Sequence, residues 1–134
     1  MPTFGKASQE RLDTCHPDLQ KLMSEVIKLY NFSVLEGERT LEKQQEYFRD
    51  KKSKLDGIVK KSKHQSSPSL AVDIIPYPID WEDRERFYFL AGLVFAKAHE
   101  LDIKIRWGGD WDNDKSFKDQ SFNDLPHFEL INIF

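Results

Sequence analysis

The chain has 134 residues and a formal net charge of -3 at pH 7, and this length is typical of a single domain. Its composition, with 39% hydrophobic and 32% charged residues, excludes a collagen, a coiled coil and a disordered tail. A mildly acidic chain is also a poor general binder of nucleic acid, because that binding depends on neutralising phosphates. We therefore expect residues 1–134 to fold as one domain, in which the single cysteine, Cys15, cannot form an internal disulfide.

The first part of the chain is predicted to contain three helices and one strand. Ser8 is expected to cap a short first helix, and a second helix is expected to begin at Pro17, where a missing N–H costs nothing. Segment 32–37 is predicted to be a strand, and Thr40 is predicted to cap a helix that reaches about Arg49. The second helix is supported by apolar residues at helical spacing, namely Leu19, Leu22, Met23, Val26, Ile27 and Tyr30.

The middle of the chain combines a polar segment with an apolar one. Residues 50–69 are polar, basic and rich in turn-forming types, which predicts a long loop inside the domain, an uncommon and often functional feature. The following residues, 70–75, form an almost continuous apolar run that contains one acid, Asp73. We predict a buried strand here, and we expect Pro76 and Pro78 to end it because proline cannot donate a hydrogen bond to a sheet.

The last third of the chain is predicted to contain one long helix and two strands. The helix is expected to begin at Asp80 or Asp83 and to end near Leu101, because its apolar residues follow helical spacing. Segments 103–107 and 127–131 are predicted to be strands that flank a polar loop. With helices early, strands scattered and no regular βαβ alternation, the chain is predicted to have an α+β fold with a small, mainly antiparallel sheet.

Three residues with metal-binding side chains lie at or near the predicted strands: His64, Asp73 and His127. Taken singly, each has an ordinary explanation: a solvated loop histidine, an acid that faces solvent or a buried ion pair, and a histidine at the core or edge of a sheet. Taken together, two imidazoles and one carboxylate fill three positions of a tetrahedral zinc site if their strands are neighbours. The fourth position is then left for water or substrate, which is the arrangement of a catalytic zinc site.

Two further residues could act on a substrate bound at such a site. Asp124, three residues before His127, could take a proton from an attacking water and pass it to a leaving amine, or it could be a surface aspartate in a turn. Arg39 could stabilise a developing oxyanion or hold a substrate carboxylate. The alternative for Arg39 is a surface ion pair with Glu36 or Glu42, which contributes little to stability.

Several short motifs extend over nearly the whole chain: Gly37-Glu-Arg39-Thr40, Ser62-Lys-His64, Ala71-Val-Asp73, Arg106-Trp-Gly-Gly-Asp-Trp111 and Asp124-x-x-His127. Together they resemble the VanY-type D-Ala-D-Ala carboxypeptidases, a family of zinc peptidases. Within that family, the motifs are most similar to those of the small phage endolysins that are L-alanyl-D-glutamate endopeptidases. The resemblance implies the hedgehog/DD-peptidase type of α+β fold, in agreement with the predicted elements.

The resemblance also implies roles for individual residues. Zinc is expected to be held by the two histidines and the aspartate named above, with Asp124 as the general acid/base, Arg39 near the scissile carbonyl and Ser62 close to the substrate. One departure from the family pattern Ser-x-His-x-x-Gly-x-Ala-x-Asp is the spacing of the first two ligands. Eight residues separate His64 from Asp73 instead of six. We expect a two-residue loop extension, because a loop absorbs extra length at a small free-energy cost.

The function implied by the resemblance is that of a zinc metallopeptidase that hydrolyses a stem-peptide bond of bacterial peptidoglycan. The specific expectation is an L-Ala-D-Glu endopeptidase acting as a bacteriophage endolysin in cell lysis. The alternatives are a D-Ala-D-Ala carboxypeptidase or dipeptidase, a non-catalytic cell-wall-binding module of the same fold, and a plain α+β domain with scattered ion pairs. Asp124 argues against the binding module, because a binder does not need a general base.

The sequence also bears on where such a protein would act. The N terminus has no apolar run typical of a secretory signal, and no segment approaches the ~18 consecutive apolar residues of a membrane span. We expect a monomer that stays in the host cytoplasm until lysis and reaches the cell wall through a separate, holin-like membrane pore.

Two remaining features are given structural explanations. The basic segment 51–63 is expected to be a solvated loop, with steering toward an anionic cell wall as the alternative. Trp81, Trp107 and Trp111 are expected mainly to pack against other residues, although segment 107–111 could shape the wall of a groove.

Overall fold

The computed structural model of the protein describes residues 2–113 and 124–131. Its elements, in chain order, are α1 (Lys6–Leu12), α2 (Pro17–Val26), β1 (Phe32–Glu36), α3 (Leu41–Arg49), the 3-10 helix η1 (Lys63–Gln65), β2 (Ala71–Pro76), α4 (Arg84–Leu101), β3 (Ile105–Gly108) and β4 (Asp124–Leu130). The strands form one sheet in the order β1-β2-β4-β3, and every neighbouring pair is antiparallel. The predicted α+β fold with a small antiparallel sheet is therefore confirmed.

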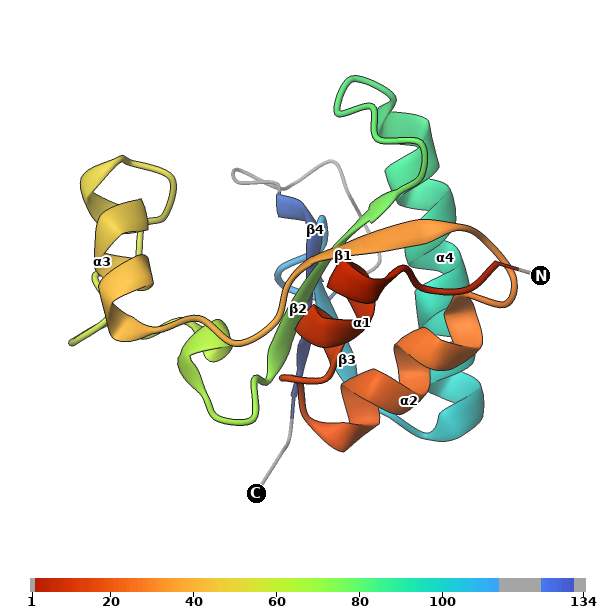
Figure 1. Cartoon of the computed structure of the whole chain (residues 1–134), viewed down its shortest axis with the longest axis horizontal. Coiled ribbons are helices and arrows are strands. Elements are labelled where there is room, and N and C mark those ends of the chain that lie inside the picture. The colour runs from red at the N-terminus through yellow and green to blue at the C-terminus, as the bar shows by residue number, and fades with distance from the viewer. Residues whose placement is uncertain (1, 114–123, 132–134) are drawn as a thin grey trace.

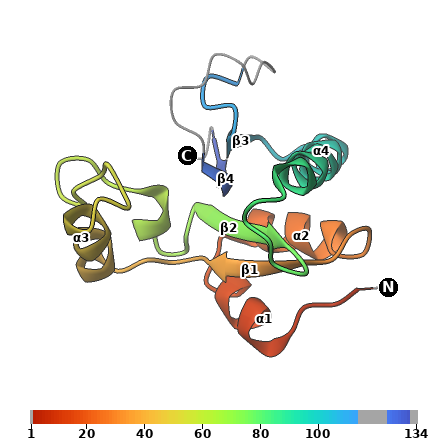
Figure 2. The ribbon, with the colours of Figure 1, turned by 90° about the horizontal axis from the view of Figure 1, so that it is seen from above.

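The helices are distributed unequally around this sheet. Figure 1 shows α2 and α4 side by side on one side of the sheet and α3 on the other side, away from both. Figure 2 shows the same separation from above, with α1 next to β1. The largest fully buried apolar side chains come from α1, α2, α4 and the sheet, and they include Leu12, Leu19, Leu22, Met23, Leu90, Ile74, Trp107 and Phe128. The core therefore lies between the sheet and the α2–α4 pair.

In the middle of β2 and β4, a polar residue lies next to residues of the core. In β2, Val72 and Ile74 belong to the core, and in β4, Phe128 does so. Because successive side chains of a strand point to opposite faces, the intervening residues Asp73 and His127 point to the face that the core does not cover. The fold thus presents a polar face of the sheet toward α3 and the loop that follows it.

Three predicted helix starts are confirmed and one is wrong. Asp83 is the N-cap of α4. Helix α2 begins at Pro17, and Thr40 caps α3 by accepting a hydrogen bond from the backbone N–H of Lys43. Ser8, however, lies inside α1, whose N-cap is Gly5. The Ser8 hydroxyl is buried and accepts a hydrogen bond from the backbone N–H of Val34 at 3.0 Å. A buried hydroxyl needs a partner, and here β1 provides it in place of the first turn of the helix.

Strand β4 begins at Asp124, three residues earlier than predicted. Gly108 of β3 pairs with Asp124, whereas the preceding residue of β3, Trp107, pairs with Phe128, so the register is interrupted around Pro126. A proline is tolerated in a strand at such a bulge because no ladder hydrogen bond is required there. The part of the predicted polar loop at 114–123 lies outside the described residues.

The long loop predicted at 50–69 is confirmed, apart from one turn of 3-10 helix. That turn is η1, and a capping box between Ser62 and Gln65 holds it: each residue's side chain accepts a hydrogen bond from the backbone of the other end of the turn. In the described ranges, no helix has both the length and the apolar character needed to cross a membrane.

The thiol of Cys15 is expected to be inert in the folded protein. Its side chain is buried, and burial raises its pKa to about 12, so the reactive thiolate is scarce near neutral pH. At pH 8 we expect labelling by a chromogenic disulfide reagent to wait for unfolding, whereas labelling in urea should proceed at the rate of a free cysteine. Absorbance stopped-flow measures both rates, and rapid labelling of the folded protein would contradict this expectation.

Candidate metal centre

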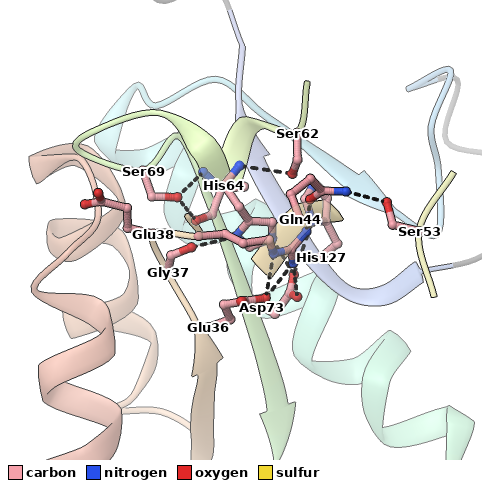
Figure 3. Close-up of polar contacts among 12 residues, drawn as sticks. Glu36, Gly37, Glu38, Gln44, Ser53, Ser62, His64, Ser69, Asp73 and His127 are labelled. Atoms are coloured by element: carbon pink, nitrogen blue, oxygen red, sulfur yellow. Dashed lines mark hydrogen bonds and ion pairs between the residues drawn. The ribbon is translucent and has the colours of Figure 1, made fainter. Parts of the chain in front are cut away.

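The pairing of β2 with β4 brings two of the three candidate ligands together. Asp73 lies directly opposite His127 in the ladder, and directly opposed residues share one face of a sheet. His64 reaches the same point from η1, where the Ser62 side chain accepts the backbone N–H of His64. Figure 3 shows the two imidazoles converging on the Asp73 carboxylate from different elements.

The three side chains form a compact cluster. Asp73 Oδ1 lies 3.1 Å from His64 Nε2 and 3.1 Å from His127 Nδ1. One ligand atom from each residue can be chosen so that all of them lie within 4.8 Å of one another. The spacing between His64 and Asp73 is two residues longer than in the family pattern. The loop between them absorbs these residues, so the ligands still meet.

The second nitrogen of each imidazole is held by an acceptor outside the cluster. His64 Nδ1 lies 2.7 Å from the carbonyl oxygen of Gly37, and His127 Nε2 lies 2.8 Å from Glu129 Oε1. Because a carbonyl and an ionised carboxylate only accept, each of these nitrogens carries the proton. When a metal ion replaces the second ring proton, the lone pairs of His64 Nε2 and His127 Nδ1 would be directed to the Asp73 side, as in metal sites whose histidines are oriented by a second hydrogen bond. The donor set thus fits a divalent metal ion.

The electrostatics of the cluster agree with a site for a cation. Burial by itself raises the pKa of Asp73, but the charges and hydrogen bonds of His64 and His127 hold that pKa well below its usual range. Burial lowers the pKa of His127, and the hydrogen bonds to Asp73 and Glu129 more than offset this and raise it to about 10. The Asp73 carboxylate therefore stays ionised and attracts positive charge. A metal ion bound by Asp73 and the two histidines would supply that charge.

Asp124 faces the same groove from the first residue of β4. Burial and the negative charge of Asp73 raise its pKa above that of an ordinary aspartate. A carboxyl group with a raised pKa exchanges protons more readily near neutral pH. A glycine is required opposite it, because a Cβ on Gly108 would lie 2.0 Å from the Asp124 carbonyl oxygen. Asp124 is therefore fixed in the strand, so the alternative of a surface turn is wrong.

Arg39 is immobilised next to the cluster. Its side chain is only 9% exposed, its Nε donates to Glu36 Oε1 at 3.1 Å and its Nη1 donates to Gln44 Oε1 at 2.7 Å. The guanidinium stacks over the Tyr47 ring at 4.7 Å, and its Nη2 lies 3.9 Å from Asp73 Oδ2. The expected ion pair with Glu36 exists, but it is largely buried and it points the guanidinium at the candidate metal site.

The cluster opens into a groove of about 1240 Å³, which we call the site groove. Arg39, Asp124 and the three candidate ligands line it, and the basic segment 51–63 contributes lysines to the lining. Trp107 is fully buried, as expected for a packing residue, and Trp111 lines the groove. Trp81 stacks on Phe87 with ring centroids 5.9 Å apart, as expected for a packing residue, and it also lines the groove and is 55% exposed.

Comparison with known proteins decides the family. The model of the phage L-alanyl-D-glutamate peptidase family matches residues 2–131. The chain belongs to this family. It is 33% identical to the L-alanyl-D-glutamate peptidase of Escherichia phage T5, over 96% of this chain and 97% of that protein. It also superposes on the crystal structure of the L-Ala D-Glu endopeptidase ChiX of Serratia marcescens with a TM-score of 0.74 and 32% identity, over 95% of this chain and 88% of the other.

In this member of the family, sequence reasoning missed Glu129. Its carboxylate is 4% exposed and contacts His127, Arg106 and, at 3.4 Å, the Nζ of Lys63. Although burial raises the pKa of Glu129, the hydrogen bonds and charges of His127 and Arg106 lower it to about 2, so it remains ionised. The signal was present in the sequence, because Glu129 lies two residues after His127 and therefore on the same face of a strand.

A second missed residue is Gln44, which has no exposed surface although it is polar. Its Oε1 accepts from Arg39, and its Nε2 donates to Ser53 Oγ at 2.9 Å and to the Leu55 carbonyl at 2.7 Å. Gln44 thereby ties the long loop to the arginine beside the metal cluster. No local pattern signals this role, because glutamine on a helix is ordinarily a solvent-facing residue.

Proposed function

We propose that the protein is a zinc-dependent peptidase that hydrolyses the L-alanyl-D-glutamate bond of the peptidoglycan stem peptide. The observation that carries this proposal is the convergence of His64, Asp73 and His127 in an open groove, in a chain of the phage L-alanyl-D-glutamate peptidase family. The peptidases of phage T5 and Serratia marcescens support the choice of bond, since both are named for it.

Zinc is the metal that this donor set favours. Two imidazole nitrogens and one carboxylate oxygen are the ligands of many catalytic zinc sites, which keep one position open for water or substrate. Zinc bound there would supply Lewis acidity to polarise the scissile carbonyl and to activate water. Oxygen-rich sites suit magnesium and calcium, and nitrogen from two histidines disfavours both ions.

The side chains around the cluster supply the remaining chemistry. We assign Asp124 the transfer of a proton from the attacking water to the leaving amine, which its position in the groove and its raised pKa support. Arg39, fixed by Glu36 and Gln44, is assigned the stabilisation of negative charge that develops on the scissile oxygen. Ser62 lines the groove close to the expected substrate position, and its hydroxyl also holds His64 in place.

We further propose that residues 1–134 form one catalytic domain that acts as a monomeric endolysin. In this proposal the enzyme remains in the host cytoplasm until lysis and then reaches the cell wall through a separate, holin-like pore. The family match over residues 2–131 supports a single catalytic unit.

The bond can be identified with purified peptidoglycan sacculi. We expect mass spectrometry of the digested material to find new amino termini on D-glutamate, together with free carboxyl groups on L-alanine. Release of free D-alanine would instead indicate the D-Ala-D-Ala carboxypeptidase alternative, and undigested sacculi would indicate a binding module.

Glu129 is expected to contribute to metal affinity although it does not belong to the candidate ligands. In Glu129→Gln, the acceptor for His127 Nε2 loses its negative charge, so the imidazole becomes a weaker ligand. We expect zinc affinity to fall by about 10- to 100-fold, as measured by competition with a chromophoric chelator. Glu100→Gln on the exposed side of α4 is the matched control and should retain wild-type affinity. Unchanged affinity in Glu129→Gln would show that the carboxylate does not act through His127.

A further inference from the structure

A second guanidinium, that of Arg106, lies in the site groove and has no part in the mechanism described above. Arg106 belongs to β3 and pairs with Glu129 in the ladder, and its Nη2 donates to Glu129 Oε2 at 2.8 Å. Its guanidinium stacks over the Trp111 ring at 5.6 Å, and the same ring lies 5.3 Å from the ring of His127. Arg106 is thus held on an aromatic surface that it shares with a candidate metal ligand.

The two guanidiniums of the groove differ in their free donor capacity. Arg39 is 9% exposed, and its Nε, Nη1 and Nη2 each donate one hydrogen bond to Glu36 or Gln44. The side chain of Arg106 is 38% exposed, and within the described part of the chain its Nη2 donates to Glu129, while its Nε is buried and has no hydrogen-bond partner. A guanidinium carries five N–H donors in a planar fork, so Arg106 retains donors for a ligand after it has bonded to Glu129.

The local charge is positive even though Arg106 is paired. Glu129 is the carboxylate that Arg106 contacts, and this carboxylate also lies 3.4 Å from Lys63 Nζ. Two cations therefore surround one anion, and His127 adds no negative charge in any protonation state. Arg106 and Lys63 together leave an excess of one positive charge at this wall of the groove, which favours an anionic ligand.

This inference rests on the proposed function. In that function, the substrate carries an anionic group next to the scissile bond. A glutamyl residue has two carboxyl groups, and only one can continue the stem peptide. The other is a free carboxylate a few bonds from the scissile nitrogen. We propose that Arg106 binds this free carboxylate and so forms the subsite that selects a glutamyl residue after the scissile bond. A planar guanidinium recognises a carboxylate through two parallel hydrogen bonds, which gives both affinity and geometric selectivity.

Two matched stem peptides test this subsite, one with the free glutamyl carboxylate and one with that group converted to a carboxamide. For the wild type we expect kcat/KM to favour the acid by about 10- to 100-fold, the range for a hydrogen bond to a charged group. In Arg106→Gln the preference should fall to near one, and Arg106→Lys should keep part of it because the charge remains. Lys43→Gln, which removes a charge from the part of the groove lining that α3 contributes, should keep the wild-type preference.

The ratio of the two peptides separates recognition from structural damage. Arg106 also contacts Glu129, so Arg106→Gln can weaken metal binding, but a loss of metal lowers the cleavage of both peptides equally. A wild-type preference that survives in Arg106→Gln, or a wild type that cleaves both peptides equally well, would overturn the subsite. A wild type that cleaves neither peptide would overturn the proposed function and this inference with it, whereas cleavage without preference overturns the inference alone.

Discussion

Replacing Asp124 with asparagine is expected to abolish peptidoglycan hydrolysis while zinc remains bound. The carboxylate lies in the site groove, three residues before His127 and outside the cluster of candidate ligands. An amide of the same shape cannot accept the proton of the attacking water, and loss of a general base lowers rates by about 10²- to 10⁴-fold. The rate is measured as release of soluble muropeptides, and the metal content is measured by elemental analysis of the same sample.

The matched control is Asp102→Asn. Asp102 ends α4 in the left-handed conformation, with φ of 57°, which asparagine adopts readily, and its side chain is 90% exposed. This variant should hydrolyse sacculi as the wild type does. Wild-type activity in Asp124→Asn would show that another group carries the proton, whereas loss of zinc would show that Asp124 belongs to the metal site itself.

Replacing His127 with alanine is expected to remove the metal and the activity together. His127 joins Asp73 to Glu129 by hydrogen bonds at 3.1 Å and 2.8 Å, and its loss leaves only two of the three candidate ligands. We expect zinc content to fall from about one ion per chain to near zero, because two protein ligands rarely retain zinc. His99→Ala, at an exposed position on α4, should retain both metal and activity.

Thermal unfolding provides a second readout for the same pair of variants. A metal that binds the folded state stabilises it by about 2.7 kcal/mol when its concentration is 100 times the dissociation constant. A strong chelator should therefore lower the Tm of the wild type and of His99→Ala, and it should leave the Tm of His127→Ala unchanged. A wild-type Tm that does not respond to the chelator would contradict a metal bound to the folded state.

The elements that were predicted best are those in which neighbouring residues decide the structure. The apolar spacing in α2 and the proline at its first position place that helix without tertiary information, because both act within one or two turns. Thr40 is a similar case, since a side-chain oxygen caps a helix through a residue three positions away. Ser8 is the exception: it has the side chain of a cap, but a strand remote in sequence uses its hydroxyl.

For the metal centre, the sequence by itself determined the chemistry of the ligands: two histidines and an aspartate in motifs of a zinc peptidase family. The tertiary structure decided that they meet, because the register that opposes Asp73 to His127 depends on strands that are distant along the chain. It also decided which nitrogen of each imidazole remains for a metal, because Gly37 and Glu129 occupy the other one. Burial and hydrogen-bond partners are properties of packed neighbours, so a linear pattern of residue types cannot specify them.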